Sequence, residues 1–414
     1  MTRPVLLAAL GVLTVALDTA VNIALPAISA AFEVPVASIQ GIVLTYVVTF
    51  AVALVPAGRL ADRAGHARVF RAGLVLTGAA HLLCGLAPAW SWLLGARVVQ
   101  GLGAALVMAS APALVTLATE PGRRGRALGH LGLAASLGAV IGPLGGGALV
   151  GALGWRIAYL GRLPLVLLSL GLARGLSASS RSGDGGTSRG PDKASVQSSG
   201  TLSGLADLRG FVIANTAHLL ANAALFAIWL LVPYYLIDRR GFPVGMSGLL
   251  FATGPLAQAC ATPLGGRLAD RGLGRWLAPL ALALEGAGLW LTGRLTDAAT
   301  PAQIVLALGL AGFGSGLFIV ANMHYVMGAV GAGHQGAAGS LVSLMRTGGI
   351  VVGASLTTAV YSAGLSTHAH LGKGGADSSA FAGAFNVAAA IAGVAALLSL
   401  VPPRAPVAVS ISAP

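Results

Sequence analysis

Four charged side chains lie deep within long apolar stretches of the chain: Asp18, Arg97, Glu285 and Arg346. A charge at membrane depth costs about 2.5–3.5 kcal/mol on insertion scales, so each is a functional candidate by default. Asp18 shares a helical face with Thr14 and Asn22, because the three residues are spaced four apart. Burial favours a neutral carboxyl group, whereas a nearby cation favours an ionised one. Asp18 is therefore a candidate for reversible proton binding, and the alternative is a fixed hydrogen-bonding role between helices.

Arg97 cannot readily lose its charge, so it needs carboxylate or carbonyl partners. We expect Arg97 and Asp18 to interact in at least one state, with proton binding at Asp18 weakening the contact. An arginine held by backbone carbonyls alone is the alternative. Glu285 is a candidate second proton-coupling site or a structural partner. Arg346 either contacts an anionic group of a substrate or anchors a carboxylate.

A polar and aromatic helical face is predicted where residues step by 3, 4, 4 and 3 positions: Asn215, His218, Asn222, Phe226 and Trp229. A mainly apolar pocket with a few orienting polar groups is typical of small-molecule sites. Interhelical hydrogen bonding and core packing are the alternative for each residue taken singly. Residues from other spans that we expect to complete this substrate cavity are Asn22, Tyr46, Phe50, Gln100, Gln258, Asn322, Tyr325 and Arg346.

Gly138, Gly142 and Gly146 are spaced four apart, so they form one flat helical face on which another helix can lie closely. Pro143 in the same stretch removes a backbone donor and kinks the helix. Such a face suits either a moving joint or a static helix contact.

The composition indicates a polytopic membrane protein. Hydrophobic residues make up 56% of the chain and charged residues only 9%, against roughly a quarter charged in soluble domains. The net charge of +13 comes from loop Lys and Arg residues, so we expect no nucleic-acid partner.

Cys84 and Cys260 lie in different apolar stretches, and His368, His370 and Asp377 are too loosely spaced to predict a metal site. Because the sequence has neither a nucleotide-binding motif nor a nucleophile–base pattern, we expect no enzymatic activity and no cofactor.

Runs of about 20 apolar residues predict twelve transmembrane helices. Their approximate limits are 5–29, 39–58, 69–89, 92–118, 126–151, 157–176, 210–236, 246–266, 275–293, 302–327, 336–364 and 380–402. We expect an N-terminal six-helix bundle at 1–176, a flexible cytoplasmic linker at 177–208 that is rich in Ser, Gly and charge, and a C-terminal six-helix bundle at 209–414.

The distribution of basic residues predicts the orientation. If the N-terminus is cytoplasmic, 17 of the 25 Lys and Arg residues lie inside. Six lie outside or near the outer helix ends: Arg156, Arg162, Arg239, Arg240, Arg294 and Lys373. This bias predicts that both termini are cytoplasmic.

An identical hexapeptide occurs once in each half. Residues 58–63 read Gly-Arg-Leu-Ala-Asp-Arg, and the same six residues return at 266–271. A long-period repeat indicates two similar halves with a functional site between them. In these turns Asp62 and Asp270 lie beside arginines near helix ends, where charge pairs and helix dipoles can stabilise one conformation. We expect conformational roles for Gly58, Asp62, Arg63, Gly266, Asp270 and Arg271; charge that merely sets topology is the alternative.

The repeated phrase, continued through residues 64–68, resembles the loop signature of the major facilitator superfamily. The stretch 97–105 is similar to that superfamily's fourth-span motif. Gly129, Gly138, Gly142-Pro143 and Gly146-Gly147 match the fifth-span signature of its drug:proton antiporters. Residues 17–26 resemble the opening span of the fourteen-span quaternary-ammonium and antibiotic efflux family, although this chain has twelve predicted spans.

This resemblance implies an all-α membrane protein with twelve transmembrane helices in two pseudo-symmetric six-helix bundles. It also implies export of a lipophilic small molecule, such as a drug or antibiotic, in exchange for protons by alternating access. On this reading the proton gradient drives transport, and the partners are the substrate, protons and the lipid bilayer. We expect a monomer in the plasma (inner) membrane. A proton-linked transporter of a cellular metabolite and a non-transporting membrane sensor are the alternatives.

Overall fold

The computed structural model describes residues 2–120, 123–173, 208–269, 274–329 and 335–400. The first half contains α1 (Arg3–Ala16), the 3-10 turn η1 (Leu17–Thr19), α2 (Ala20–Phe32), α3 (Val36–Ala64), α4 (His66–Gly85), α5 (Trp90–Leu117), α6 (Arg124–Leu153), α7 (Ile157–Leu160) and α8 (Leu163–Ala173). The second half contains α9 (Leu208–Tyr234), the π-helical turn η6 (Tyr235–Arg239), α10 (Val244–Leu268), α11 (Gly274–Gly293), α12 (Pro301–Gly328), α13 (Gln335–Thr367), the 3-10 turn η9 (Ala369–Leu371) and α14 (Gly372–Ser399).

Every predicted span overlaps a helical segment, and the predicted all-α membrane fold is confirmed. Ten segments of the described chain are long and apolar enough to cross a membrane. The predicted sixth span is instead divided between α7 and α8, and the predicted ninth span is formed by α11. Within the predicted linker, only Leu208 is among the described residues. The domain boundaries therefore stay a prediction.

The first span is interrupted near its centre. Residues 3–32 form one apolar segment, but Leu17–Thr19 adopts a 3-10 turn between α1 and α2. A 3-10 turn is tighter than the α-helix and alters the direction of successive side chains. Asp18 is the middle residue of this turn, so its direction is set by the local change in helix type.

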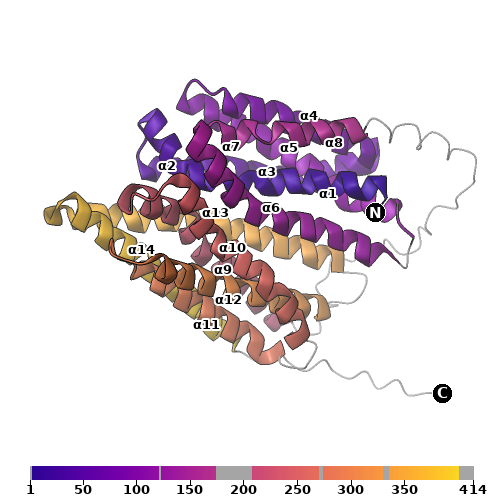
Figure 1. Ribbon diagram of the computed structural model, residues 1–414. Coiled ribbons are helices and arrows are strands. Elements are labelled where there is room, and N and C mark those ends of the chain that lie inside the picture. Colours follow the sequence, from indigo (N-terminus) through magenta and orange to yellow (C-terminus); the bar gives the residue numbers. More distant parts are fainter. Residues whose placement is uncertain (1, 121–122, 174–207, 270–273, 330–334, 401–414) are drawn as a thin grey trace, which may run out of the picture.

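Helices within each half pack extensively on one another (Figure 1). In the first half, α3 and α4 both pack against α5, and α1 packs against α6. In the second half, α12 packs between α10 and α11, while α9 packs against α13 and α14. Close packing on α12 depends on glycines, because a Cβ at Gly312 would collide with the backbone of Gly254 and one at Gly314 with that of Glu285.

Contacts between the halves gather at one end of the molecule. The largest core cluster joins both halves, whereas the remaining clusters of described residues each lie within one half. The joining cluster includes Ile28 of α2 and Ile39 of α3, at the end opposite the N-terminus, together with Tyr234 of α9. The two halves are therefore joined at the end remote from the N-terminus.

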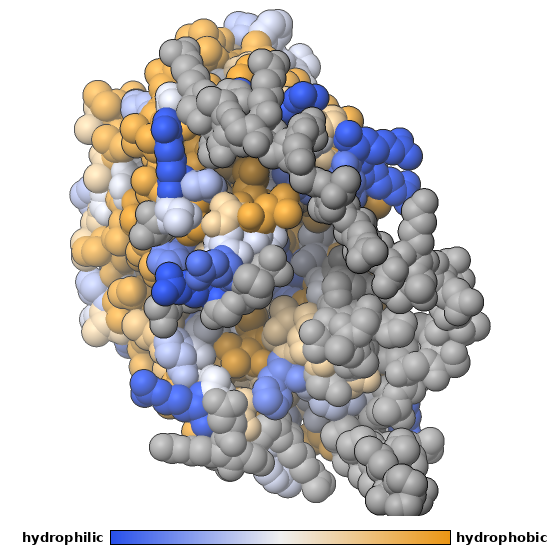
Figure 2. Space-filling view, turned by 90° about the vertical axis from the view of Figure 1, so that its right-hand side faces the viewer, coloured by the Kyte–Doolittle hydropathy of each residue, from blue (hydrophilic) through white to orange (hydrophobic). Residues whose placement is uncertain are grey.

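Large apolar side chains remain exposed on the outer helix surfaces. Val52 on α3 and Leu117 on α5 are 72% and 74% exposed, and Leu397 on α14 is 67% exposed. Figure 2 looks onto the end of the molecule near the termini, where hydrophilic side chains gather and hydrophobic ones cover the flank. This distribution fits helices whose sides face lipid and whose ends face water.

Candidate functional site

Asp18 is held by a bidentate ion pair with Arg97 of α5. Arg97 Nη1 donates to Asp18 Oδ1 at 2.8 Å, and Arg97 Nη2 donates to Oδ2 at 2.9 Å. The Arg97 side chain is only 1% exposed and that of Asp18 is 14% exposed. A planar guanidinium fork matches a carboxylate in this geometry, so the pair is both strong and directional. The contact expected between Asp18 and Arg97 is present in this state.

A second arginine binds the same carboxylate. Arg162 Nη1 donates to Asp18 Oδ1 at 2.9 Å, and Arg162 is 5% exposed. Arg162 was expected outside or near the outer helix ends, and that expectation is wrong, because Asp18 lies at the centre of the first span. Arg162 follows Gly161 at the break between α7 and α8, which turns its side chain inward to Asp18.

Neighbouring groups fix both arginines, and for Arg162 the partner is the Ala158 carbonyl, which accepts from Nε at 2.9 Å. Gln100 Nε2 donates to Asp18 Oδ1 at 2.8 Å, and its Oε1 accepts from Arg97 Nη1 at 2.8 Å. Arg97 Nε donates to the Ile42 carbonyl at 2.9 Å, and the Tyr46 ring lies 4.5 Å from the guanidinium carbon. Arg97 thus has both the carboxylate and the carbonyl partners that were expected as alternatives.

The cluster carries two guanidinium groups for one carboxylate. In each of its side-chain hydrogen bonds within the described chain, Asp18 accepts, from Arg97, Arg162 and Gln100. Taking up a proton would convert one acceptor oxygen into a donor hydroxyl facing cationic donors. The geometry therefore makes the cluster sensitive to the protonation of Asp18.

Asp18 is connected to α6 through its neighbour Thr19. Thr19 Oγ1 donates to the Gly138 carbonyl of α6 at 3.1 Å. A Cβ at Gly138 would collide with Ala16, one at Gly142 with Thr19, and one at Gly146 with Ala20. The three glycines thus form the predicted flat face, and the helix lying on it is the α1–α2 span.

The contact between halves uses the adjoining surface of α6. A Cβ at Gly147 would lie 2.8 Å from the Gly248 Cα and 2.9 Å from the Val244 carbonyl oxygen, both in α10. A Cβ at Gly248 would in turn collide with the Pro143 carbonyl. Since only glycine leaves room here, α6 and α10 meet backbone to backbone.

Two hydrogen bonds also cross between the halves at this end. Thr358 Oγ1 of α13 donates to Gln40 Oε1 of α3 at 2.9 Å, and the Tyr234 hydroxyl of α9 donates to the Leu25 carbonyl of α2 at 3.3 Å. All of these contacts lie in segments remote from the N-terminus, which agrees with the shared core cluster.

Some polar groups on the predicted face of α9 form hydrogen bonds within α9, and others are buried without a partner. Asn215 and Asn222 donate to carbonyls one turn earlier, at Phe211 and His218. Asn215 and His218 are 4% and 3% exposed, and Asn215 Oδ1 and His218 Nδ1 have no hydrogen-bond partner among the described residues. The buried face of α9 therefore has an amide oxygen and an imidazole nitrogen that make no hydrogen bond within the described chain.

Other predicted cavity residues make mixed contacts. Tyr46 and Phe50 stack with ring centroids 6.3 Å apart, and Trp229 packs edge-on against Phe251 at 5.2 Å. Gln258 donates to Ser315 at 3.3 Å. The remaining members are Asn22, which donates to the Thr19 carbonyl at 3.3 Å, Asn322, which is 3% exposed, and Tyr325, which is partly buried.

Glu285 lies apart from the Asp18 cluster. It is 0% exposed in α11, and a Cβ at Gly314 of α12 would collide with its backbone. No salt bridge reaches Glu285 within the described chain, and neither of its carboxyl oxygens has a hydrogen-bond partner among the described residues. Glu285 therefore lies in a helix interface rather than in an open cavity.

Arg346 lies on α13 and is exposed. Its charge acts on Tyr46 of the first half and on His218 of the second. No ion pair or hydrogen bond joins it to another described residue. Of the two roles expected for Arg346, the described part of the chain provides no carboxylate for it to anchor.

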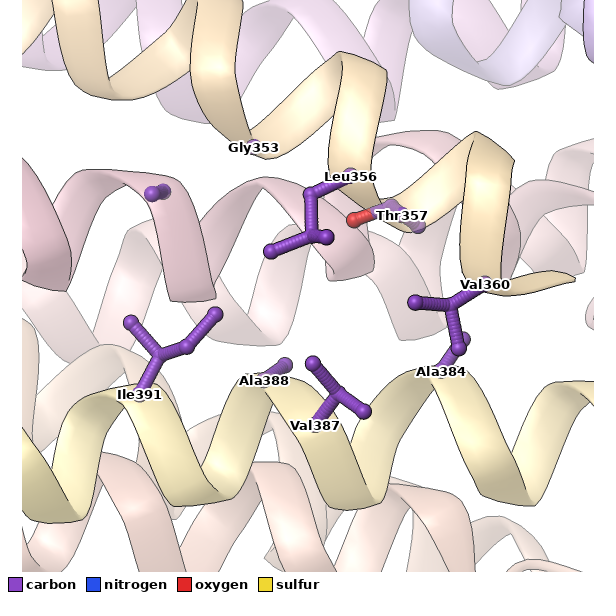
Figure 3. A pocket seen from close by; sticks show the side chains of 9 residues that line it. Gly353, Leu356, Thr357, Val360, Ala384, Val387, Ala388 and Ile391 are labelled. Atoms are coloured by element: carbon purple, nitrogen blue, oxygen red, sulfur yellow. The ribbon is translucent and has the colours of Figure 1, made fainter.

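A small apolar pocket lies elsewhere, between α9, α13 and α14 (Figure 3). Thr357 is the one polar residue in its lining, which comprises Ala223, Gly353, Leu356, Thr357, Val360, Ala384, Val387, Ala388 and Ile391. None of these was predicted as a cavity residue, and no charged side chain reaches the pocket.

The two copies of the repeated hexapeptide were expected to have conformational roles, and the described residues do not show the contacts that such roles require. Asp62 is 73% exposed and pairs with His66 at 3.7 Å rather than with an arginine, while Arg63 is exposed. A Cβ at Gly58 or Gly266 would meet nothing within 4 Å, so packing does not require glycine there. Asp270 and Arg271 lie outside the described residues. Over the part of the chain that the structure describes, no group of three His, Cys, Asp or Glu residues could hold a metal.

Known proteins resemble this chain in sequence, and solved structures resemble it in fold. The family model described as Major Facilitator Superfamily matches residues 7–243 and 214–413. The puromycin resistance protein pur8 of Streptomyces alboniger is 31% identical over 84% of this chain and 79% of its own length. The multidrug resistance protein Stp of Mycobacterium tuberculosis is 29% identical over 86% of this chain and 75% of its own length.

A solved structure has the same arrangement of helices. It is a bacterial homolog to the human lysosomal transporter Spinster in an inward-facing and unoccupied conformation, with a TM-score of 0.79. It covers 96% of this chain and 95% of its own at 19% identity, a likeness that shows the fold alone. Taken with the family match over nearly the whole sequence, these findings show that the chain is a multi-pass membrane transporter belonging to the Major Facilitator Superfamily.

Proposed function

We propose that this chain exports a lipophilic small molecule, such as a drug or antibiotic, in exchange for protons. The observation that carries the proton coupling is the membrane-embedded Asp18 carboxylate, which joins η1 to α5 and to the α7–α8 junction. The resistance proteins among its relatives support the export of toxic compounds. The protein acts in the plasma membrane as a monomer with both termini cytoplasmic.

The Asp18 cluster provides the proton-dependent step. With Asp18 ionised, two arginines from different helices are drawn to one carboxylate. Proton binding removes the negative charge, so the attraction that holds α5 and the α7–α8 junction to η1 weakens. During this step Arg97 keeps its hydrogen bonds to Gln100 and to the Ile42 carbonyl.

Movement at η1 reaches the contact between halves through α6. Thr19 follows Asp18 directly and is hydrogen-bonded to Gly138. Gly142 and Gly146 lie against the same span, while Pro143 and Gly147 touch Gly248 of the other half. A shift of the 3-10 turn would therefore be transmitted to the α6–α10 contact through the short stretch of α6 from Gly138 to Gly147. This gives conformational roles to Gly138, Gly142, Pro143 and Gly146.

The conformation fits one state of an alternating-access cycle. The halves share a core at the end remote from the N-terminus and have separate cores at the other end. With the N-terminus cytoplasmic, the joined end is the outer one, and the halves have separate cores at the inner end. The outward-open state requires the α6–α10 contact and the Gln40–Thr358 hydrogen bond to separate.

Substrate is bound between the halves in this proposal. Tyr46 and Phe50 provide stacked aromatic rings from the first half, and Trp229 and Arg346 come from the second. An apolar site with few polar groups suits varied lipophilic compounds. Glu285 is a second candidate proton site, because it is a fully buried acid without a cationic partner among the described residues.

A growth-inhibition panel in an efflux-deficient bacterium tests the function. Wild type, Asp18→Asn and the outer-loop control Asp297→Asn are compared at matched membrane expression against cationic dyes, neutral antibiotics and anionic compounds. We expect wild type and the control to protect, and Asp18→Asn to lose protection. Substrate-dependent proton release from energised vesicles then tests coupling directly. Protection retained by Asp18→Asn, with normal proton release, would remove Asp18 from the mechanism.

The direction of flux separates export from the uptake or exchange of a metabolite. In everted vesicles, an exporter accumulates its substrate inside when the lumen is acidified. Efflux of preloaded substrate under the same gradient would instead support a proton-linked importer. No flux of any kind would favour a sensor that retains the fold.

A further inference from the structure

The membrane-embedded charges of the described chain do not balance. Arg97, Arg162 and Arg346 provide three guanidinium groups, and Asp18 and Glu285 are the acids at comparable depth. Asp18 is shared between the first two arginines. Glu285 is 0% exposed in the interface of α11 with α12, so it cannot reach a ligand between the halves. Arg346 is left without a counterion among the residues that the structure describes.

The other acids described in the second half are engaged elsewhere. Asp297 and Asp377 both pair with Arg239 at the outer end, at 2.6 and 3.4 Å. Asp377 also accepts a hydrogen bond from the Tyr361 hydroxyl. Asp238 lies in η6 next to Arg239, at the same outer end. None of these acids pairs with Arg346.

Arg346 is also accessible from the space between the halves. Its side chain is exposed, and α13 packs both against α3, which carries Tyr46, and against α9, which carries His218. A residue that faces both halves and is exposed lies on the wall of the space between them. The guanidinium is therefore positioned to meet a ligand that enters this space.

A guanidinium at membrane depth needs a partner, because an unpaired charge there is costly. We propose that the partner is an anionic group, such as a carboxylate, on the exported compound, so that the substrates are lipophilic organic acids. The inference rests on the proposed function and names its substrate class. Arg346 would bind the acid through charge-assisted hydrogen bonds, which a planar guanidinium makes in bidentate form.

The surroundings of Arg346 suit the apolar part of such a compound. Tyr46 stacks with Phe50, and His218 lies with its ring 5.9 Å from that of Phe318. Organic cations find no equivalent partner, because both Asp18 oxygens already accept hydrogen bonds from arginine. The charge of the site thus favours acids and disfavours organic cations.

Three probes with one scaffold and different charges test this inference. They are 4-(1-pyrenyl)butyrate, its neutral methyl ester and the matching trimethylammonium cation. Binding to the purified full-length protein is measured by energy transfer from tryptophan to pyrene. We expect the acid to bind roughly 10- to 100-fold more tightly than the ester, which is the effect of one or two hydrogen bonds to a charged group.

Variants at Arg346 assign that preference to its side chain. Arg346→Gln should bring the acid to the affinity of the ester, and Arg346→Lys should keep part of the difference, because it retains the charge and loses the fork. Arg294→Gln is the control, since Arg294 stacks on Trp290 at 4.9 Å at the end of α11. Equal binding of acid and ester, tighter binding of the cation, or an unchanged preference in Arg346→Gln would overturn the inference.

The resistance panel decides if no probe binds. Protection confined to cationic compounds, or full protection against acids by Arg346→Gln, would overturn the inference as well, while loss of protection against acids alone would support it. These outcomes differ from failure of the proposed function. Proton-coupled export of cations would leave that function intact, whereas selective binding of the acid without any flux would remove the function and keep the binding site.

Discussion

In the first half, Asp18 accepts hydrogen bonds from Arg97, Arg162 and Gln100, and these residues are fixed by further contacts. In the second half, Arg346 has no ion pair within the described chain. Buried polar atoms without a hydrogen-bond partner occur in both halves, among them Arg162 Nη2, Asn215 Oδ1 and His218 Nδ1. Buried polar groups are normally satisfied, so the unsatisfied ones need an explanation. The halves therefore differ in the pairing of their embedded charges: those of the first half are joined in one ion-paired cluster, whereas Arg346 of the second half stays available for a ligand.

The largest effect should come from removing the shared carboxylate. Asp18→Asn leaves two guanidinium groups without a counter-charge, and breaking a buried ion pair costs about 3–5 kcal/mol. We expect a large fall in the thermal unfolding temperature of the purified protein. Asp297→Asn, which removes an exposed acid, should leave that temperature nearly unchanged. Similar stability of the two variants would contradict the structural role of the cluster.

The next largest loss of unfolding free energy should come from Arg162, which binds Asp18 from the α7–α8 break. Arg162→Gln removes one charged hydrogen bond to Asp18, worth about 1.5–3 kcal/mol. A double-mutant cycle with Asp18→Asn should be non-additive, because both changes remove the same contact. Additive losses in unfolding free energy would show that Arg162 and Asp18 do not interact.

A third change acts on the contact between halves. A side chain at Gly147 has no room against Gly248 and Val244, so Gly147→Leu should separate α6 from α10. Overpacking of this kind costs about 1–3 kcal/mol. The readout is disulfide formation between Gln40→Cys and Thr358→Cys, which should slow by roughly tenfold, the equivalent of about 1.4 kcal/mol. Gly129→Leu is the matched control on α6, because a Cβ there meets nothing within 4 Å; equal slowing by the control would dismiss the contact.

The smallest effect should come from the second-half acid. Glu285→Gln keeps the side-chain volume and breaks no ion pair, so we expect a change below about 1.5 kcal/mol in unfolding free energy. If Glu285 also carries a proton, the number of protons released per substrate should fall while transport continues. An unchanged ratio would assign Glu285 a structural role only.

Much of the fold could be predicted from sequence. Apolar runs of membrane length located every span, and the four-residue spacing of Gly138, Gly142 and Gly146 predicted a face that does receive another helix. The Asp18–Arg97 contact also followed from charge alone, since two opposite charges in apolar spans need partners.

The part that sequence could not give depends on breaks in helices and on partners from other spans. Arg162 reaches Asp18 because the sixth span is interrupted beside Gly161, and a count of basic residues placed it near the membrane surface instead. Its neighbours Gly161 and Pro164 were the available signal for such a break. Likewise, the sequence offered both an anchoring and a substrate-binding role for Arg346, and only the arrangement of the other acids separates them.

The isolation of Arg346 from the Asp18 cluster has an evolutionary consequence. A substitution at Arg346 would disturb none of the hydrogen bonds that hold Asp18. Exposure to a new toxic compound could therefore select variants of α13 that alter which molecules are expelled while the energy-converting machinery is inherited intact. In such a protein the range of compounds tolerated by the cell can drift by single mutations, and resistance to an unfamiliar antibiotic needs no new pump.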